Sequence, residues 1–167
     1  WVRGGTHFLT APLVLKPEDS NLKLLAYPKE QPVLSGGRRI TGWKEVTVAG
    51  KKLWAVDIPE ARAGKWFFRE LWMNGERRVR ARHPNKGYFS IENLPDTAKE
   101  WTDGHRRFKF RGTDLQAWPS VTNAEVVALA RWVESRLPVT SVDESQHLVN
   151  FAKRSVFELQ NDDLYYL

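Results

Sequence analysis

The chain has 167 residues, a formal net charge of +6 and no cysteine, which excludes a disulfide framework and a thiolate metal site. Its apolar content of 41% is typical of a globular protein and excludes a disordered one. No apolar stretch reaches the roughly 18 residues that a transmembrane helix needs, so no membrane partner is expected. Eight Trp and eight Phe beside a single Met indicate aromatic-rich sheet packing, carbohydrate contact, or both.

The first 37 residues predict short strands with frequent breaks. Strand-like runs at Thr6–Leu9, Leu13–Leu15, Leu22–Tyr27 and Pro32–Ser35 are separated by glycines, prolines and polar turns. The first two runs resemble the last two after a displacement of fewer than about 20 residues. Short strands that recur at such a spacing predict a solenoid, and an ordinary β-meander is the alternative.

Longer strands with alternating side chains follow from Thr41. Glu45–Val48 and Leu53–Ile58 flank a predicted hairpin turn, and Pro59–Lys65 is predicted to be a loop. Asn74-Gly75 then stands between two further strand-like runs, where a two-residue turn with positive φ suits both residues. We therefore expect a second hairpin with arms Phe68–Met73 and Arg77–Arg82.

The second arm of this hairpin carries three arginines at alternate positions, which predicts that they share one face: Arg78, Arg80 and Arg82. The row is either a solvated surface, or it faces interior acids or a carboxylate-bearing or polyanionic ligand. Because like charges at this spacing repel, at least one arginine is expected to reach outside the hairpin, and Arg82 is the preferred candidate.

Most of the remaining chain is also predicted to be β. Tyr88–Ile91 and Arg106–Arg111 are strand-like, and residues between them form a long polar loop. Asn123–Leu137 fits a helix with one apolar face and also fits a strand, and its β-rich surroundings favour the strand.

Three further strands are predicted near the end. Val139–Val142 and His147–Phe151 are expected to pair across a polar turn, and Val156–Leu159 is the last predicted strand.

Catalytic signals are sparse. None of the nine acids considered stands in a context that pairs it with another: Asp19, Asp57, Glu70, Glu92, Asp96, Asp103, Asp114, Glu125 and Asp143. The four histidines lack metal-ligand spacing, and no phosphate-binding loop or Gly-x-Ser-x-Gly elbow occurs, so neither a metal nor a cofactor is predicted. The candidate substrate-binding residues are Arg80, Arg82, His83 and Trp101, the last because an exposed indole can contact a sugar ring.

An ordered set of motifs carries a family resemblance: Gly4–Leu9, Ala26–Pro28, Pro32–Gly37, Ile40–Trp43, Arg69–Gly75, Arg78–Arg82, Asp114–Trp118 and Arg131–Leu137. In this order they resemble the N-terminal part of bacterial right-handed parallel β-helix proteins related to glycoside hydrolase family 141. The resemblance implies an all-β fold in which residues 1–42 form the first β-helix coils. Residues 43–158 would form an inserted antiparallel barrel or sandwich, and residues 159–167 a return strand toward the β-helix.

The resemblance also implies a function. The chain would be the non-catalytic front of a secreted, extracellular or periplasmic glycoside hydrolase acting on plant or algal-type polysaccharide. Its partners would be that glycan and the remainder of the parent β-helix, and the catalytic carboxylates would lie outside this segment. The chain opens without Met and inside a strand-like run, so we expect a fragment. The alternative is a basic β-domain that binds nucleic acid or another polyanion.

Overall fold

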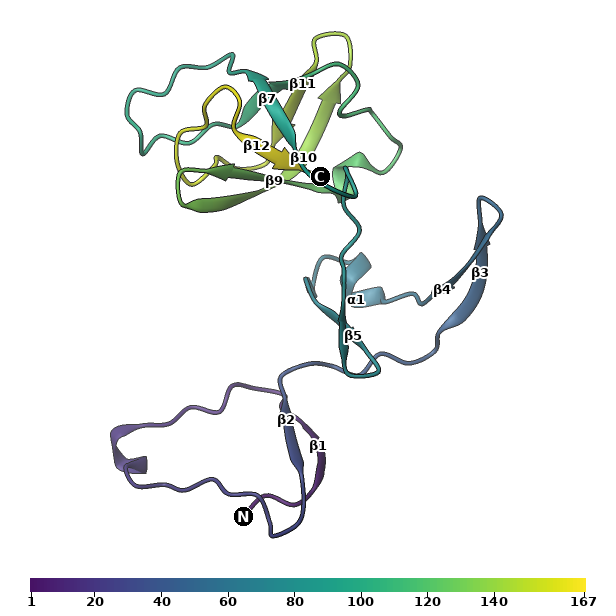
Figure 1. Ribbon diagram of the computed structural model, residues 1–167, viewed down its shortest axis with the longest axis vertical. Coiled ribbons are helices and arrows are strands. Elements are labelled where there is room, and N and C mark those ends of the chain that lie inside the picture. Colours follow the sequence, from purple (N-terminus) through teal and green to yellow (C-terminus); the bar gives the residue numbers. More distant parts are fainter. The chain divides into compact units, whose positions relative to one another are not determined.

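The structure is a computed structural model that describes all 167 residues, and the chain divides into two compact units, Trp1–Phe67 and Phe68–Leu167. Regular structure is mostly β, and its largest assembly is a closed barrel (Figure 1). The predicted all-β class and the antiparallel barrel are therefore confirmed. The parallel β-helix stays a prediction.

The N-terminal unit contains one parallel strand pair. β1 (Gly5–Phe8) pairs with β2 (Pro32–Ser35), and the connection between them carries the short 3₁₀ helix η1 (Pro17–Asp19). Gly5 lies opposite Pro32, and an isolated parallel bridge joins Val2 to Ala26. Partner residues are thus 27 and 24 positions apart, and the predicted repeat of fewer than 20 residues is wrong.

Two of the strands predicted in this unit do not form. Leu13–Leu15 is irregular, and Leu22–Tyr27 contributes only the bridge at Ala26. A β-strand forms only when its backbone can hydrogen-bond to a neighbouring strand, and an apolar sequence does not by itself provide that neighbour. Both segments belong to the long connection between β1 and β2.

The first predicted hairpin is present. β3 (Lys44–Val48) and β4 (Lys51–Ala55) pair in antiparallel register around Ala49 and Gly50, whose φ angles are 48° and 75°. The predicted loop that follows instead contains the four-residue helix α1 (Pro59–Arg62), with proline in the first turn, where its missing N–H costs nothing. No helix of the chain has the length and hydrophobicity needed to cross a bilayer.

The N-terminal unit has no buried core. Every residue of this unit is exposed or only partly buried, and the first buried residue of the chain is Ile91. The exposed side chains include most of the large apolar residues of the β1–β2 region: Phe8, Leu9, Leu13, Val14, Leu15, Leu22, Leu24, Leu25, Tyr27, Val33 and Leu34.

The second unit begins with the predicted Asn-Gly hairpin. β5 (Leu71–Met73) pairs with β6 (Glu76–Arg78), and the φ angles of Asn74 and Gly75 are 55° and 77°. The turn is confirmed, but both arms are shorter than predicted. Because β6 ends at Arg78, the predicted single-strand face of three arginines is wrong.

Six antiparallel strands close the barrel in the order β10-β11-β8-β7-β12-β9 (Figure 1). These strands are β7 (Phe89–Asn93), β8 (Arg107–Phe110), β9 (Glu125–Ala130), β10 (Val133–Asp143), β11 (Leu148–Phe151) and β12 (Leu164–Tyr166). Alternate residues of each strand point inward and form the core, as expected for a small barrel. Its members are Ile91, Phe108, Phe110, Val126, Ala128, Ala130, Leu137, Val139, Val149, Phe151 and Tyr165, with Leu115, Val121 and Leu159 added from the connections.

The ambiguous segment Asn123–Leu137 is extended, so the strand interpretation is confirmed, but it forms two strands. The 3₁₀ helix η2 (Val121–Asn123) leads into β9, and β9 turns into β10 at Arg131, whose φ is 54°. Burial alternates along β10, whereas β9 is buried at nearly every position, so both of its faces are covered.

The predicted last strand, Val156–Leu159, does not form. Its backbone N–H groups bond to loops and side chains: Val156 to Ser135 Oγ at 2.9 Å, Glu158 to the Trp101 carbonyl at 3.0 Å and Leu159 to His105 Nδ1 at 3.1 Å. The last strand is β12, which pairs with β7 and β9.

The residues that flank the barrel strands, His83 before β7 and Leu167 after β12, are hydrogen-bonded to each other. The His83 N–H donates to the Leu167 carbonyl at 2.8 Å, and the Leu167 N–H donates to the His83 carbonyl at 2.9 Å. β12 lies in the segment predicted as a return strand and is itself a barrel strand. The predicted division into residues 1–42, 43–158 and 159–167 stays a prediction.

Candidate functional site

A cavity of about 620 Å³ lies against the outer face of β9, and we call it the arginine cavity. Val126, Ala128 and Ala130 face the core, so Glu125 and Val127 face outward. Six arginines line the cavity together with these two residues: Arg69, Arg77, Arg78, Arg80, Arg82 and Arg136.

The strand register assembles the wall of this cavity. Val127 lies opposite Arg136 on β10 and opposite Tyr166 on β12, so these three outward positions are neighbours across three adjacent strands. Val127 is only 1% exposed although it faces away from the core. The outer wall is therefore covered here, and the chain from Arg77 to Arg82 lines the opposite side.

Arg80 and Arg82 both leave the hairpin, as the sequence predicted for at least one arginine. Arg80 forms an ion pair with Glu125. The Arg82 guanidinium lies 3.9 Å from the ring centroid of Tyr166 and donates to the carbonyls of Pro84 at 3.1 Å and Gly87 at 2.5 Å. Arg78 stays within the hairpin, paired with Glu76 at 3.2 Å.

Glu125 is the anionic centre of the arginine cavity and is only 8% exposed. Its Oε1 pairs with Arg80, with Arg136 Nη1 at 3.3 Å and with Arg69 Nε at 3.7 Å. Burial acts to raise the pKa of Glu125, but the hydrogen bond and charge of Arg80, aided by Arg136 and Arg69, outweigh it and hold the pKa below its usual value. Glu125 is thus ionised at neutral pH.

The other two predicted binding residues lie outside the arginine cavity. His83 is exposed, and its ring makes edge contacts with Phe89 and Trp118 at centroid distances of 5.0 and 5.9 Å. Trp101 lies on the loop after β7 and is 48% exposed. The structure therefore brings together Arg80 and Arg82, but neither His83 nor Trp101 joins them.

Trp101 instead belongs to an exposed group that we call the aromatic platform, formed by Trp101, Trp132 and Phe157. Ring centroids lie 6.1 Å apart for the two tryptophans, and Phe157 lies 5.1 Å from Trp101 and 5.4 Å from Trp132. Trp132 is 72% exposed at the β9–β10 turn. Arg131 lies 5.3 Å from the Trp101 ring centroid and pairs with Glu158 at 3.4 Å.

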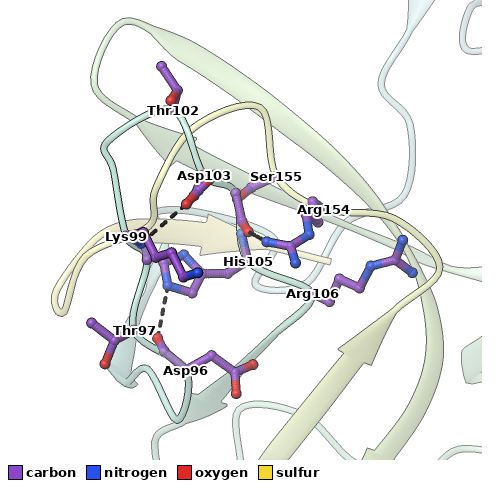
Figure 2. A pocket seen from close by; sticks show the side chains of 11 residues that line it. Asp96, Thr97, Lys99, Thr102, Asp103, His105, Arg106, Arg154 and Ser155 are labelled. Carbon is purple, nitrogen blue, oxygen red and sulfur yellow. Dashed lines mark hydrogen bonds between the residues drawn. The ribbon is translucent and has the colours of Figure 1, made fainter.

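A second cavity, of about 600 Å³, lies beside the loop that carries Trp101 (Figure 2). His105 is its most buried titratable side chain, at 4% exposure. Because His105 Nδ1 accepts the Leu159 N–H, the neutral ring carries its proton on Nε2, which lies 3.0 Å from the Asp96 carbonyl. Both ring nitrogens are hydrogen-bonded, so His105 links the loop at Asp96 to the segment at Leu159. Neither nitrogen is free to serve as a general base.

The acids of the barrel also have structural partners. The Tyr165 hydroxyl donates to Asp114 Oδ2 at 3.1 Å, and burial raises the pKa of Asp114. Asp96 pairs with Arg107 at 2.6 Å, and that hydrogen bond lowers the pKa of Asp96. No group of three or more His, Asp or Glu side chains is placed to hold a metal ion.

Comparisons of the chain with protein-family models, with curated proteins and with solved structures found no match. The arginine cavity and the aromatic platform are therefore interpreted from their geometry. Sequence reasoning did not assign Glu125, Arg136 or Tyr166 to the first, or Phe157 to the second. It named Trp132 only among the tryptophans that could contact a sugar ring.

Proposed function

We propose that this chain is the non-catalytic front of a secreted carbohydrate-active β-helix protein, and that its barrel binds polysaccharide beside the substrate cleft. The observation that carries this proposal is the parallel pairing of β1 with β2 across a connection of one coil's length. Parallel strands in an ordinary α/β fold are joined by a crossover helix. Here the connection has only a three-residue 3₁₀ turn, as a solenoid coil does.

Two features of the two units support this proposal. The apolar side chains around β1 and β2 are exposed, and the coils of a solenoid bury such side chains against the next coil. His83, ahead of the first barrel strand, pairs with Leu167, directly after the last barrel strand. Neighbouring ends suit a domain inserted into a host fold.

The aromatic platform gives the barrel a surface suited to sugar rings. Exposed indole faces offer flat apolar area, and each indole N–H adds a polar contact. Arg131 and Glu158 next to the platform can hydrogen-bond sugar hydroxyls.

Binding to a panel of neutral and acidic polysaccharides, measured by affinity electrophoresis, tests this function. We expect retardation by at least one glycan, loss of that retardation in Trp101→Ala or Trp132→Ala, and no release of reducing ends. Trp43→Ala, in the N-terminal unit, is the matched control. If no glycan retards the protein while nucleic acid binds with a steep salt dependence, the proposed function fails and the polyanion alternative replaces it.

A further inference from the structure

Arginines dominate the lining of the arginine cavity, which contains six of them and one acid, Glu125. Beyond the three contacts to Glu125, Arg136 pairs with Glu134 at 2.7 Å, Arg77 with Glu70 at 3.0 Å and Arg78 with Glu76 at 3.2 Å. These charges line a partly enclosed space, where screening by water and salt is weaker than on an open surface.

Arg82 is the lining arginine whose guanidinium meets no carboxylate. Its Nε and Nη2 donate to backbone carbonyls, and its plane lies against Tyr166. These contacts fix the guanidinium in place but leave its charge unanswered. A planar guanidinium that is held in this way is suited to bind an oxyanion through two parallel hydrogen bonds.

We propose that the arginine cavity is an oxyanion subsite that binds the carboxylate or sulfate group of an acidic polysaccharide, with Arg82 as the main contact. This inference rests on the proposed function and specifies its substrate class. Tyr166, whose ring lies against Arg82, also lines the cavity and holds the guanidinium at this site.

The distribution of acids favours a polysaccharide over a nucleic acid. Glu70, Glu76 and Glu134 pair with arginines that line the cavity and place negative charge around it. A phosphate backbone is usually bound along an extended track of cations, whereas one carboxylate or sulfate on a sugar needs a single local site. Three of the arginines, Arg69, Arg80 and Arg136, also cluster around one residue, Glu125.

Binding of three oligosaccharide probes of equal length to the full chain, measured by isothermal titration calorimetry, tests the subsite. The probes are an oligogalacturonide, a sulfated dextran fragment and a neutral dextran fragment. We expect at least one acidic probe to bind, and Arg82→Gln to weaken it by about tenfold or more. Arg82→Lys, which keeps the charge and loses the fork, should weaken it severalfold. The better acidic probe shows which of the two oxyanions the subsite prefers.

Arg111→Gln is the matched control, because Arg111 belongs to the same unit, pairs with Asp162 at 2.5 Å and does not line the arginine cavity. This variant removes the same charge as Arg82→Gln, and we expect it to change the affinity for the acidic probe by less than about twofold. Equal losses in Arg82→Gln and Arg111→Gln would show attraction to net charge alone and would overturn the subsite. Thermal unfolding midpoints verify that each variant is folded. If Arg82→Gln is destabilised, the binding loss in Arg82→Lys becomes the test of the subsite.

The outcomes separate this inference from the proposed function. Glycan binding that is neutral-selective, or indifferent to Arg82, overturns the subsite and leaves the proposed function standing. Binding to nucleic acid with no binding to any glycan overturns both, as does a failure of all probes to bind.

Discussion

The two units of this chain differ in how they use apolar residues. In Phe68–Leu167 the six strands close on themselves, and Phe108, Phe110 and Tyr165 are at most 1% exposed. Apolar residues are also frequent in Trp1–Phe67, yet none of them is buried. The barrel has a hydrophobic core of its own, whereas the N-terminal unit leaves its apolar side chains exposed or only partly buried.

The largest expected effect comes from truncating the barrel core. Phe108→Ala should lower the free energy of unfolding by about 3–5 kcal/mol, because it leaves a cavity among residues that cannot collapse into it. Phe8→Ala is the matched control, since Phe8 is 47% exposed, and we expect a change of less than about 0.5 kcal/mol. Urea midpoints of the two variants measure the difference. Comparable losses would mean that β1 contributes to a shared core.

Two glycines, one in each unit, allow the packing of the units to be compared by adding a methyl group. A Cβ on Gly104 would lie 1.8 Å from the Ser155 carbonyl oxygen, while a Cβ on Gly36 meets nothing within 4 Å. Gly104→Ala should cost about 1–3 kcal/mol, because backbone must move to accept the methyl group. Gly36→Ala should be neutral by the same thermal denaturation assay. A harmless Gly104→Ala would show that the loop can part from Ser155.

Glu125 tests the electrostatic part of the barrel unit. Glu125→Gln should cost about 1–3 kcal/mol at pH 7, because it removes the charge to which three arginines bond. The folded pKa of Glu125 is lowered, so its contribution is complete above the unfolded pKa of about 4.3 and is lost as pH falls through the lower folded value. Stability measured from pH 3 to 7 should therefore show the two proteins converging at the acid end.

Glu45→Gln serves as its counterpart in the N-terminal unit, where Glu45 pairs with Lys52 at 2.9 Å on the surface. We expect no measurable change in stability. A pH-independent gap between Glu125→Gln and the parent would contradict the ionised state assigned to Glu125.

The two hairpins supply the smallest effect. Their turns have the same pair of positive φ angles, but Ala49 occupies the position that Asn74 holds in the other. Ala49→Asn should stabilise the β3–β4 hairpin by up to about 1 kcal/mol, because Asn tolerates the left-handed region better than Ala does. Asn74→Ala should weaken the β5–β6 hairpin by a similar amount. Hydrogen exchange measures both changes. The cross-strand amide protons of β3–β4 should exchange more slowly in Ala49→Asn than in the parent, and those of β5–β6 faster in Asn74→Ala. Unchanged rates would argue against this account of the turns.

Sequence reasoning predicted those parts of the fold that depend on local rules. The Asn74-Gly75 turn follows from the φ angles that only a few residues tolerate, and alternation identified β8. The extended state of β9 and β10 was predicted from their β-rich surroundings, since their own pattern also fits a helix. It failed where pairing with distant residues decides. Leu13–Leu15 is apolar enough for a strand but has no partner, and Val156–Leu159 bonds to loops instead of a ladder.

The candidate site divides in the same way. The arginine spacing predicted that some of these side chains would seek partners beyond the hairpin, and Arg80 and Arg82 do so. The identity of the partners, Glu125 and Tyr166, depends on barrel closure, which places β9 beside β12. No local pattern in the sequence contains that pairing.

Hydrogen–deuterium exchange tests the central claim most directly, namely that the barrel has a buried core of its own while the N-terminal unit has none. We predict that amides of the barrel strands exchange slowly, and that amides of β1 and β2 exchange at least about a hundredfold faster. Equal protection of β1, β2 and the barrel strands would contradict the account.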